Sequence, residues 1–201
     1  VDREMEGEIK SNCEIITFDD SDELVEAVSN LLVSGKVIGW MQGGSEIGPR
    51  ALGNRSILAN PSFEWMQDYI NGDIKGREWY RPFAPSVLYE EQSKVFELDT
   101  YSPHMLVTTN VKEDWRTKIP SVTHIDNTSR YQSVTKENNP LYHKLISKFN
   151  ENTGIPLVLN TSFNGPDEPI VESPYDAIRT FWTRGLSAIC VENVLIIKKQ
   201  F

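Results

Sequence analysis

The glycine-rich segment 43–56 combines a pliable backbone with two arginines. Its sequence, GGSEIGPRALGNRS, places Gly48 and Gly53 on either side of Arg50, with Arg55 close behind. Glycine lets backbone N–H groups approach an anion, and guanidinium groups bind phosphate or carboxylate through paired donors. The segment is neither a Walker A loop, which needs Gly-Lys-Ser/Thr, nor a GxGxxG dinucleotide motif. A structural turn with solvated arginines is the alternative, but the arginines and the serine favour anion binding.

A second segment, 75–86, concentrates positive charge beside aromatic rings. Lys75, Arg77 and Arg81 fall within seven residues. Neighbouring aromatics lower the local dielectric constant and strengthen a contact between a cation and an anion. Pro82 and Pro85 lack a backbone donor, so this segment is expected at a sheet edge or in irregular structure. A solvated charged loop is the alternative interpretation.

The third segment, 123–132, is dense in hydrogen-bonding groups and contains Arg130. Polar stretches of this kind are mostly surface turns. His124 with Asp126 could perform acid–base chemistry, although a lone histidine is more often structural or exposed. We therefore select Arg130 as the candidate functional residue of the segment and keep His124 as a secondary possibility.

In the fourth segment, 158–171, an apolar strand runs into small polar side chains. Asn160, Ser162 and Asn164 occupy alternate positions, and Ser162 and Asn164 would share one face of an extended chain. Polar groups at the carboxyl end of a strand are well placed to bind a ligand in an open sheet. An ordinary turn closed by side-chain hydrogen bonds is the alternative.

Together the first three segments hold six cations, which are Arg50, Arg55, Lys75, Arg77, Arg81 and Arg130. Lys136 follows nearby in the sequence. If the fold brings these segments together, they form an anion pocket inside an acidic protein. The residues alone therefore predict a site for a phosphate-bearing small molecule, with a nucleotide as one candidate.

Composition restricts the class of protein. The 201 residues carry 20 Lys+Arg and 29 Asp+Glu, a net charge of −9, which argues against sequence-independent nucleic-acid binding. Two cysteines and three dispersed histidines predict neither a disulfide framework nor a structural metal site.

No run of about 18 apolar residues is present, and the first ten residues are polar and acidic, unlike a signal peptide. We expect a cytoplasmic protein without a membrane span, cut from something longer.

The elements that must position these residues alternate between strands and helices. Residues 1–12 are expected to be a linker or frayed end, followed by one domain over 13–201. Strands are predicted at 13–18, 37–41, 82–88, 105–111, 156–159 and 188–197, and helices at 21–32, 62–71, 140–152 and 173–183. The alternation lacks a strict βαβ rhythm, so we predict a single α/β domain, bordering on α+β, with a twisted mixed sheet flanked by helices.

The four segments resemble the C-terminal domain of the O-carbamoyltransferases, a family that includes nodulation and antibiotic carbamoyltransferases. The matching strings, in the family's order, are GGSEIGPRALGNRSILANP, IKGREWYRPFAPSV, PSVTHIDNTSRYQSV and TGIPLVLNTSFNGPDEPIVESPYDAIRTF. The domain is also similar to the YrdC-like fold of threonylcarbamoyl-adenylate synthases, in which a Lys-x-Arg and a Ser-x-Asn element hold the nucleotide and the acyl group. Lys75-Gly76-Arg77 and Ser162-Phe163-Asn164 fit those elements. Asp167 stands where the family usually has glycine directly before Glu-Pro.

The resemblance implies that this domain converts carbamoyl phosphate and ATP to carbamoyl adenylate, with Mg²⁺ carried by ATP. An N-terminal actin-like domain, absent from these residues, would pass the carbamoyl group to an acceptor hydroxyl. The implied catalytic cations are Lys75, Arg81 and Arg130. The implied binding groups are Gly48, Arg50, Gly53, Arg55, Arg77, Asn160, Ser162 and Asn164. A nucleotide- or phosphate-binding module without turnover in isolation is the alternative function.

Overall fold

The computed structural model describes residues 3–199, which build one nine-stranded mixed sheet in the order β1-β9-β8-β2-β3-β7-β4-β6-β5. β2 with β8 and β4 with β6 are parallel pairs, and the other neighbours are antiparallel. The strands are β1 Cys13–Thr17, β2 Ile38–Met41, β3 Arg55–Ala59, β4 Ala84–Leu88, β5 Val107–Asn110, β6 Thr128–Val134, β7 Leu157–Ser162, β8 Ala188–Val191 and β9 Val194–Lys198. The predicted mixed sheet is confirmed.

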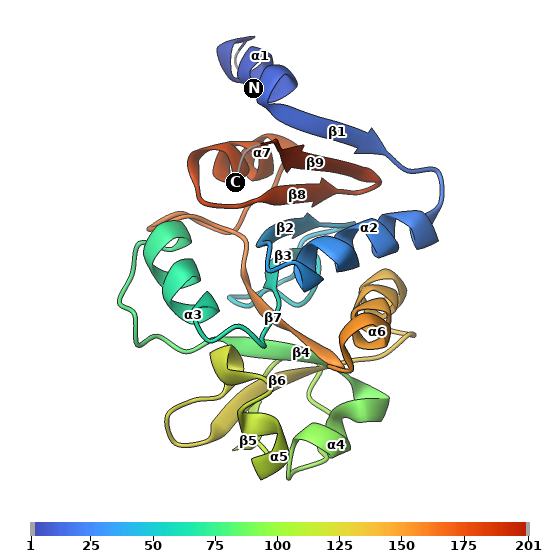
Figure 1. The fold of residues 1–201 in the computed structure, drawn as a ribbon, viewed down its shortest axis with the longest axis vertical. Coiled ribbons are helices and arrows are strands. Elements are labelled where there is room, and N and C mark those ends of the chain that lie inside the picture. Colours follow the sequence, from blue (N-terminus) through green and yellow to red (C-terminus); the bar gives the residue numbers. More distant parts are fainter. Residues whose placement is uncertain (1–2, 200–201) are drawn as a thin grey trace.

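Helices flank the sheet on both sides (Figure 1). They are α1 Arg3–Asn12, α2 Ser21–Val33, α3 Met66–Tyr69, α4 Gln92–Val95, α5 Glu113–Arg116, α6 Pro140–Thr153 and α7 Pro174–Thr183, with a π-helix at Ile70–Ile74 and 3₁₀ turns at Tyr89–Glu91 and Pro120–Val122. α2 and α6 pack side by side. Both have apolar stripes that cover the buried strands. None of the helices within 3–199 is long and apolar enough to cross a bilayer.

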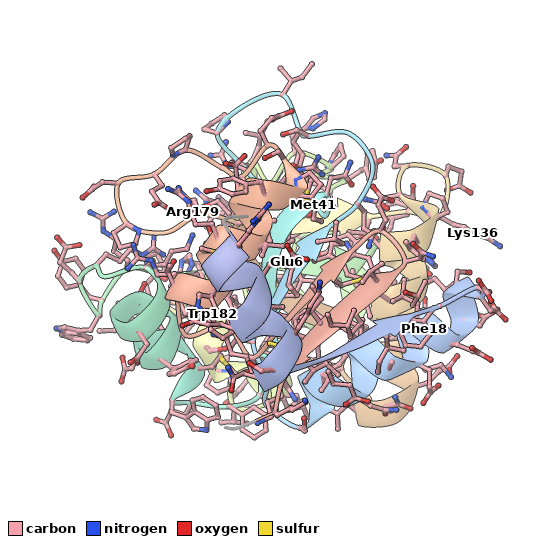
Figure 2. The ribbon with its side chains drawn as sticks, turned by 90° about the horizontal axis from the view of Figure 1, so that it is seen from above. Glu6, Phe18, Met41, Lys136, Arg179 and Trp182 are labelled. Carbon is pink, nitrogen blue, oxygen red and sulfur yellow. The ribbon has the colours of Figure 1, made fainter. Side chains whose placement is uncertain are left out.

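Residues 3–12 form a helix, which corrects the prediction of a linker or frayed end. α1 has one buried apolar contact point, Ile9, and the indole Nε1 of Trp182 donates to Glu8 Oε2 at 2.9 Å. Figure 2 shows α1 lying beside Trp182. Met5 also packs against the core. Two apolar contacts among charged residues are too few to form a clear helical periodicity in the sequence.

Two strands, β3 and β6, were not predicted. β3 is buried along its whole length but follows the glycine-rich segment directly. The polar sequence of β6 favours a surface turn, yet Ser129 and Ser133 are buried within the strand. Their hydroxyls donate to Val122 O at 2.7 Å and Gln92 Oε1 at 2.6 Å. A polar strand can lie inside the domain because each of these groups has a partner.

The segment after the second cation cluster is an interior strand, which corrects the expectation of an edge or irregular structure. β4 lies between β7 and β6. Pro85 is tolerated because β6 pairs only with Ser86–Leu88, so Pro85 lies beyond that parallel ladder.

The helix predicted at 62–71 begins later, at Met66, and changes from an α-helix to a π-helix after Tyr69. Ser62 does not cap it, because its N–H and hydroxyl both bond to Asn60 Oδ1. α3 occupies only Met66–Tyr69 and continues as the π-helix Ile70–Ile74, which delivers the chain to Lys75. π-helical turns recur at functional sites.

Candidate functional site

Two adjoining cavities gather most of the predicted cations. The arginine cavity has a volume of about 190 Å³, and its lining includes Arg50, Arg77, Phe83, Arg130, Asn160 and Ser162. The lysine cavity has a volume of about 320 Å³, and its lining includes Lys75, Arg77, Glu78, Arg81, Ser162, Asn164 and Asp167. Arg77 and Ser162 belong to both walls. The fold therefore brings four distant sequence segments to one cationic site.

Lys75 is buried at the end of the π-helix, with 6% of its surface exposed. Its ammonium group donates to Ser162 Oγ at 3.2 Å, Asn164 O at 3.1 Å and Asn164 Oδ1 at 2.6 Å, and also to Ser162 O. All four acceptors are uncharged. Burial, and secondarily the charge of Arg77, lowers the pKa of Lys75 to about 7. An anion entering the lysine cavity would supply the missing negative charge.

Arg77 is held from two sides. Its Nε donates to Asn71 Oδ1 at 2.8 Å, and its guanidinium carbon lies 4.9 Å from the centre of the Phe83 ring. Burial, and then the charge of Arg81, lowers the pKa of Arg77. Arg77 is thereby fixed in the wall that the two cavities share.

Arg130, on β6, lines the arginine cavity together with Arg77, which lies in the loop before β4. Its Nε is buried without a hydrogen-bond partner. Burial, and then the nearby charge of Arg50, lowers the pKa of Arg130. Two close guanidinium groups and an unused donor together favour an anionic ligand.

Arg81 differs from the other cations of the lysine cavity. Half of its side chain is exposed, and its Nε forms an ion pair with Glu78 Oε2 at 2.8 Å. It sits at the rim, where water screens its charge. A polyanionic ligand would have to compete with Glu78 for Arg81.

Ser162 and Asn164 form a connected pair at the end of β7. Ser162 Oγ donates to Asn164 Oδ1 at 2.7 Å, and Asn164 Nδ2 donates to Glu168 O at 2.7 Å. Asp167, in the position of the family's glycine, adopts φ +53°. Aspartate tolerates this left-handed conformation better than most residues, so the turn retains the geometry that a glycine would favour.

Arg55 lies away from both cavities, with 4% of its surface exposed. Its guanidinium donates to the carbonyls of Gln42 at 3.1 Å, Gly43 at 3.0 Å and Asn54 at 3.0 Å. We assign Arg55 to closing the ends of the glycine-rich segment rather than to ligand binding. Gly48, by contrast, lies in the exposed part of that segment with φ +125° and open space around its α-carbon.

Gly53 has a packing role. It adopts φ +109°, and a β-carbon there would lie 2.3 Å from Cδ1 of the buried Tyr142 ring. Its N–H donates to Ser56 Oγ, and its carbonyl accepts from Trp40 Nε1. Gly53 and Tyr142 therefore fix the glycine-rich segment against α6.

The substitution Gly53→Ala is expected to destabilise the protein by about 3 kcal/mol or more, because backbone strain and overpacking add. Urea unfolding followed by tryptophan fluorescence measures the change. Gly44→Ala is the matched control, because Gly44 has open space around its α-carbon and no positive φ. Equal stabilities of the two variants would contradict the packing role.

Asn160 is 2% exposed and tied into the sheet. Its Nδ2 donates to Ala51 O at 3.1 Å and Ser86 Oγ at 2.9 Å. Its Oδ1 is buried without a partner. Asn160 thus connects β7 to the glycine-rich segment and forms part of the arginine-cavity wall.

His124 and Lys136 lie outside the two cavities. His124 lines a neighbouring groove, where its Nδ1 is 3.2 Å from Thr128 Oγ1, and burial above all lowers its pKa. Lys136 is exposed, and Figure 2 shows it projecting from the edge of the molecule. Within residues 3–199 no three His, Cys, Asp or Glu side chains gather to hold a metal ion.

Sequence reasoning missed two residues that support the cations. Glu46 Oε1 accepts from the N–H groups of Leu52, Asn54 and Arg55 at 2.7, 2.8 and 3.2 Å, which shapes the loop that carries Arg50. A carboxylate among glycines and arginines was the available signal. Asn71 offered no signal, because its role depends on the π-helical turn.

Comparison with known proteins identifies the family. The family model "Carbamoyltransferase C-terminus" matches residues 29–198. Nodulation protein NolNO of Sinorhizobium fredii is 44% identical over 98% of this chain and 30% of its own length. The 3'-hydroxymethylcephem-O-carbamoyltransferase of Streptomyces clavuligerus is 41% identical over 76% of this chain and 29% of its own length. The chain thus spans about a third of the length of these relatives.

A solved structure supports the fold. P. abyssi Sua5, complexed with L-threonine, superposes with a TM-score of 0.64 at 15% identity, covering 86% of this chain and 47% of that one. The predicted YrdC-like architecture is therefore confirmed. The order of the four motifs and the family-model match over residues 29–198 indicate the same family. The chain belongs to the carbamoyltransferase family and corresponds to the C-terminal region of its members.

Proposed function

We propose that this domain forms carbamoyl adenylate from carbamoyl phosphate and ATP. The observation that carries the proposal is the pair of cationic cavities joined at Arg77 and Ser162. Two polyanionic reactants must lie side by side for the reaction, and fixed cations offset their mutual repulsion. The names of the relatives, carbamoyltransferases among them, agree with a carbamoyl donor.

Atom balance fixes the products. Carbamoyl adenylate contains the carbamoyl group and AMP but not the phosphoryl group of carbamoyl phosphate. Water must therefore release inorganic phosphate from carbamoyl phosphate and leave carbamate. A carbamate oxygen then bonds to the α-phosphorus of ATP while the bond to the β-phosphate oxygen breaks, and pyrophosphate leaves. One phosphate and one pyrophosphate accompany each adenylate.

The proposed roles follow from position. Lys75, Arg81 and Arg130 stabilise the negative charge of the acyl phosphate and the nucleotide phosphates. Arg50, Arg77 and the amides near Gly48 complete the anion cradle. Ser162 and Asn164 provide hydrogen-bonding groups for the carbamoyl group or the α-phosphate, with Asn160 in the wall behind them. No protein nucleophile is needed, because catalysis rests on positioning and charge. Mg²⁺ would be supplied with ATP and would be held by phosphate and water oxygens, where it would offset the charge of the phosphates.

The test follows phosphate and pyrophosphate release from Mg-ATP and carbamoyl phosphate, with each substrate omitted in turn. We expect pyrophosphate release only when both are present, with phosphate in equal amount. Pyrophosphate release from ATP alone would contradict the proposal.

The alternative function is a binding module that needs further chain segments for turnover. The exposed rim position of Arg81 favours it, because a second domain could complete that side. This alternative predicts that ATP raises the melting temperature without any pyrophosphate release. The acceptor hydroxyl and the transfer step would then lie with an N-terminal domain, as the greater length of the relatives suggests.

A further inference from the structure

Asn71 lies at the centre of a set of hydrogen bonds that shapes the cationic loop 75–81. It is fully buried in the π-helix. Its Nδ2 donates to Trp79 O at 3.0 Å and Arg81 O at 2.9 Å, and its Oδ1 accepts from Arg77 Nε at 2.8 Å. Its backbone carbonyl also accepts the Arg77 N–H at 2.9 Å. One side chain thus connects the C-terminal half of the loop, at Trp79 and Arg81, to the guanidinium of Arg77.

We infer that Asn71 is a positioning residue that presents the Arg77 guanidinium to anions in both cavities. Because Nε is committed to Asn71 and the ring of Phe83 lies against the guanidinium, the terminal Nη groups remain for a ligand. Within residues 3–199, no protein group accepts a hydrogen bond from those Nη groups. The inference rests on the proposed function, since it assumes that Arg77 binds phosphate groups.

The π-helical turn explains why an asparagine can do this. A wider turn places Lys75 N–H on Ile70 O, five residues earlier, and moves the chain that follows it toward the Asn71 side chain. A carboxamide supplies two donors and an acceptor in one plane, and this loop requires two donors and an acceptor. A carboxylate would have no proton for the Trp79 and Arg81 carbonyls.

Gln67, one turn earlier, provides an internal comparison. Its Nε2 donates to the same two carbonyls, but at 3.4 and 3.2 Å and from a less buried position. Within residues 3–199, the Gln67 side chain forms no hydrogen bond with Arg77. Gln67→Ala is therefore the matched control for loss of loop hydrogen bonds without loss of the arginine contact.

The first experiment needs no ligand. Hydrogen exchange of the backbone amides and of the arginine Nε–H groups is measured by NMR in the wild-type chain, Asn71→Leu, Asn71→Ala and Gln67→Ala. We expect the Nε–H of Arg77, which donates to Asn71 Oδ1, to lose protection in both Asn71 variants and to keep it in Gln67→Ala, while amides of β7 stay protected in all. Unchanged protection of the Arg77 Nε–H in a folded Asn71 variant would overturn the inference. The smaller Asn71→Ala serves if the leucine does not fit.

The second experiment is a double-mutant cycle on affinity for inorganic pyrophosphate, measured by calorimetry. Asn71→Leu is expected to weaken binding about 10-fold in the wild-type background, as for loss of a hydrogen bond to a charged group. In an Arg77→Ala background the same change should have little effect, because Asn71 acts through that arginine. Equal losses in both backgrounds would overturn the inference. If the wild type binds no pyrophosphate, the proposed function fails, and the exchange experiment alone decides whether Asn71 shapes the loop.

Discussion

The variant Arg130→Ala is expected to lower pyrophosphate release by about 100-fold or more, the usual loss when one preorganised charge-stabilising group is removed. Arg130 is half-buried, and its Nε has no protein partner. The guanidinium is therefore prepared for a ligand rather than used by the fold. Removing it also relieves the repulsion that Arg50 exerts, so the melting temperature should stay equal or rise.

The measurement is initial rate against carbamoyl phosphate concentration at saturating Mg-ATP, with Lys136→Ala as the matched control. Lys136 carries the same charge near the end of β6 but projects from the edge of the molecule. A comparable loss in the two variants would mean that net charge, and not the arginine cavity, controls the rate. A fall in rate together with a fall in melting temperature would assign Arg130 to the fold.

Lys75 is expected to make ATP binding depend on pH. Its pKa is lowered to about 7, first by burial and then by Arg77, so the free protein loses this charge above neutrality. A polyanion binds the charged form and must restore the proton. Affinity for ATP should be highest near or below pH 7 and should fall by up to about tenfold per pH unit above it, the limit for one linked proton.

Calorimetry in buffers of different ionisation enthalpy between pH 7.5 and 9.5 tests this, because proton uptake on binding appears as a buffer-dependent heat. Lys75→Met should bind ATP weakly, with no such heat from this site, whereas Lys136→Met should behave as wild type. Wild-type affinity that is flat across the window would disprove the role of Lys75.

Stability has a related pH dependence. A lysine with pKa about 7 in the folded state and an ordinary value in the unfolded state binds fewer protons when folded, between about pH 7 and the ordinary lysine range. The free energy of unfolding contributed by this group therefore rises with pH through that window. Below pH 7 both states carry the proton, and the full cost of burying the charge remains.

The helices could be predicted where their ends carry local signals. Pro140 begins α6 and Gly154 ends it at φ +74°, while Ser173 and Asp176 form a capping box at the start of α7. These signals act over a few neighbouring residues, so a single sequence contains them. The four motif segments were likewise visible as clusters of residue types.

The contacts between segments could not be predicted in the same way. Arg55 resembled Arg50 in the sequence, but only the fold places its guanidinium on backbone carbonyls. β6 resembled a turn because its serines find partners on Val122 and Gln92. Residue type indicates which chemistry is available, and tertiary distance decides whether a ligand or the protein uses it.

The order of the sheet also constrains how the chain folds during synthesis. β1 pairs with β9, and β2 pairs with β8, so within this domain the first strands to be made wait for strands that follow them by about 150 residues or more. Such non-local pairings slow folding and leave strand edges exposed in the meantime. We expect α2 and α6 to pack and the β4–β6–β7 region to form first, with β1 and β2 completed only once β8 and β9 have left the ribosome. A nascent chain stalled before residue 188 would therefore hold its cationic segments near one another while one side of its sheet stayed open to chaperones.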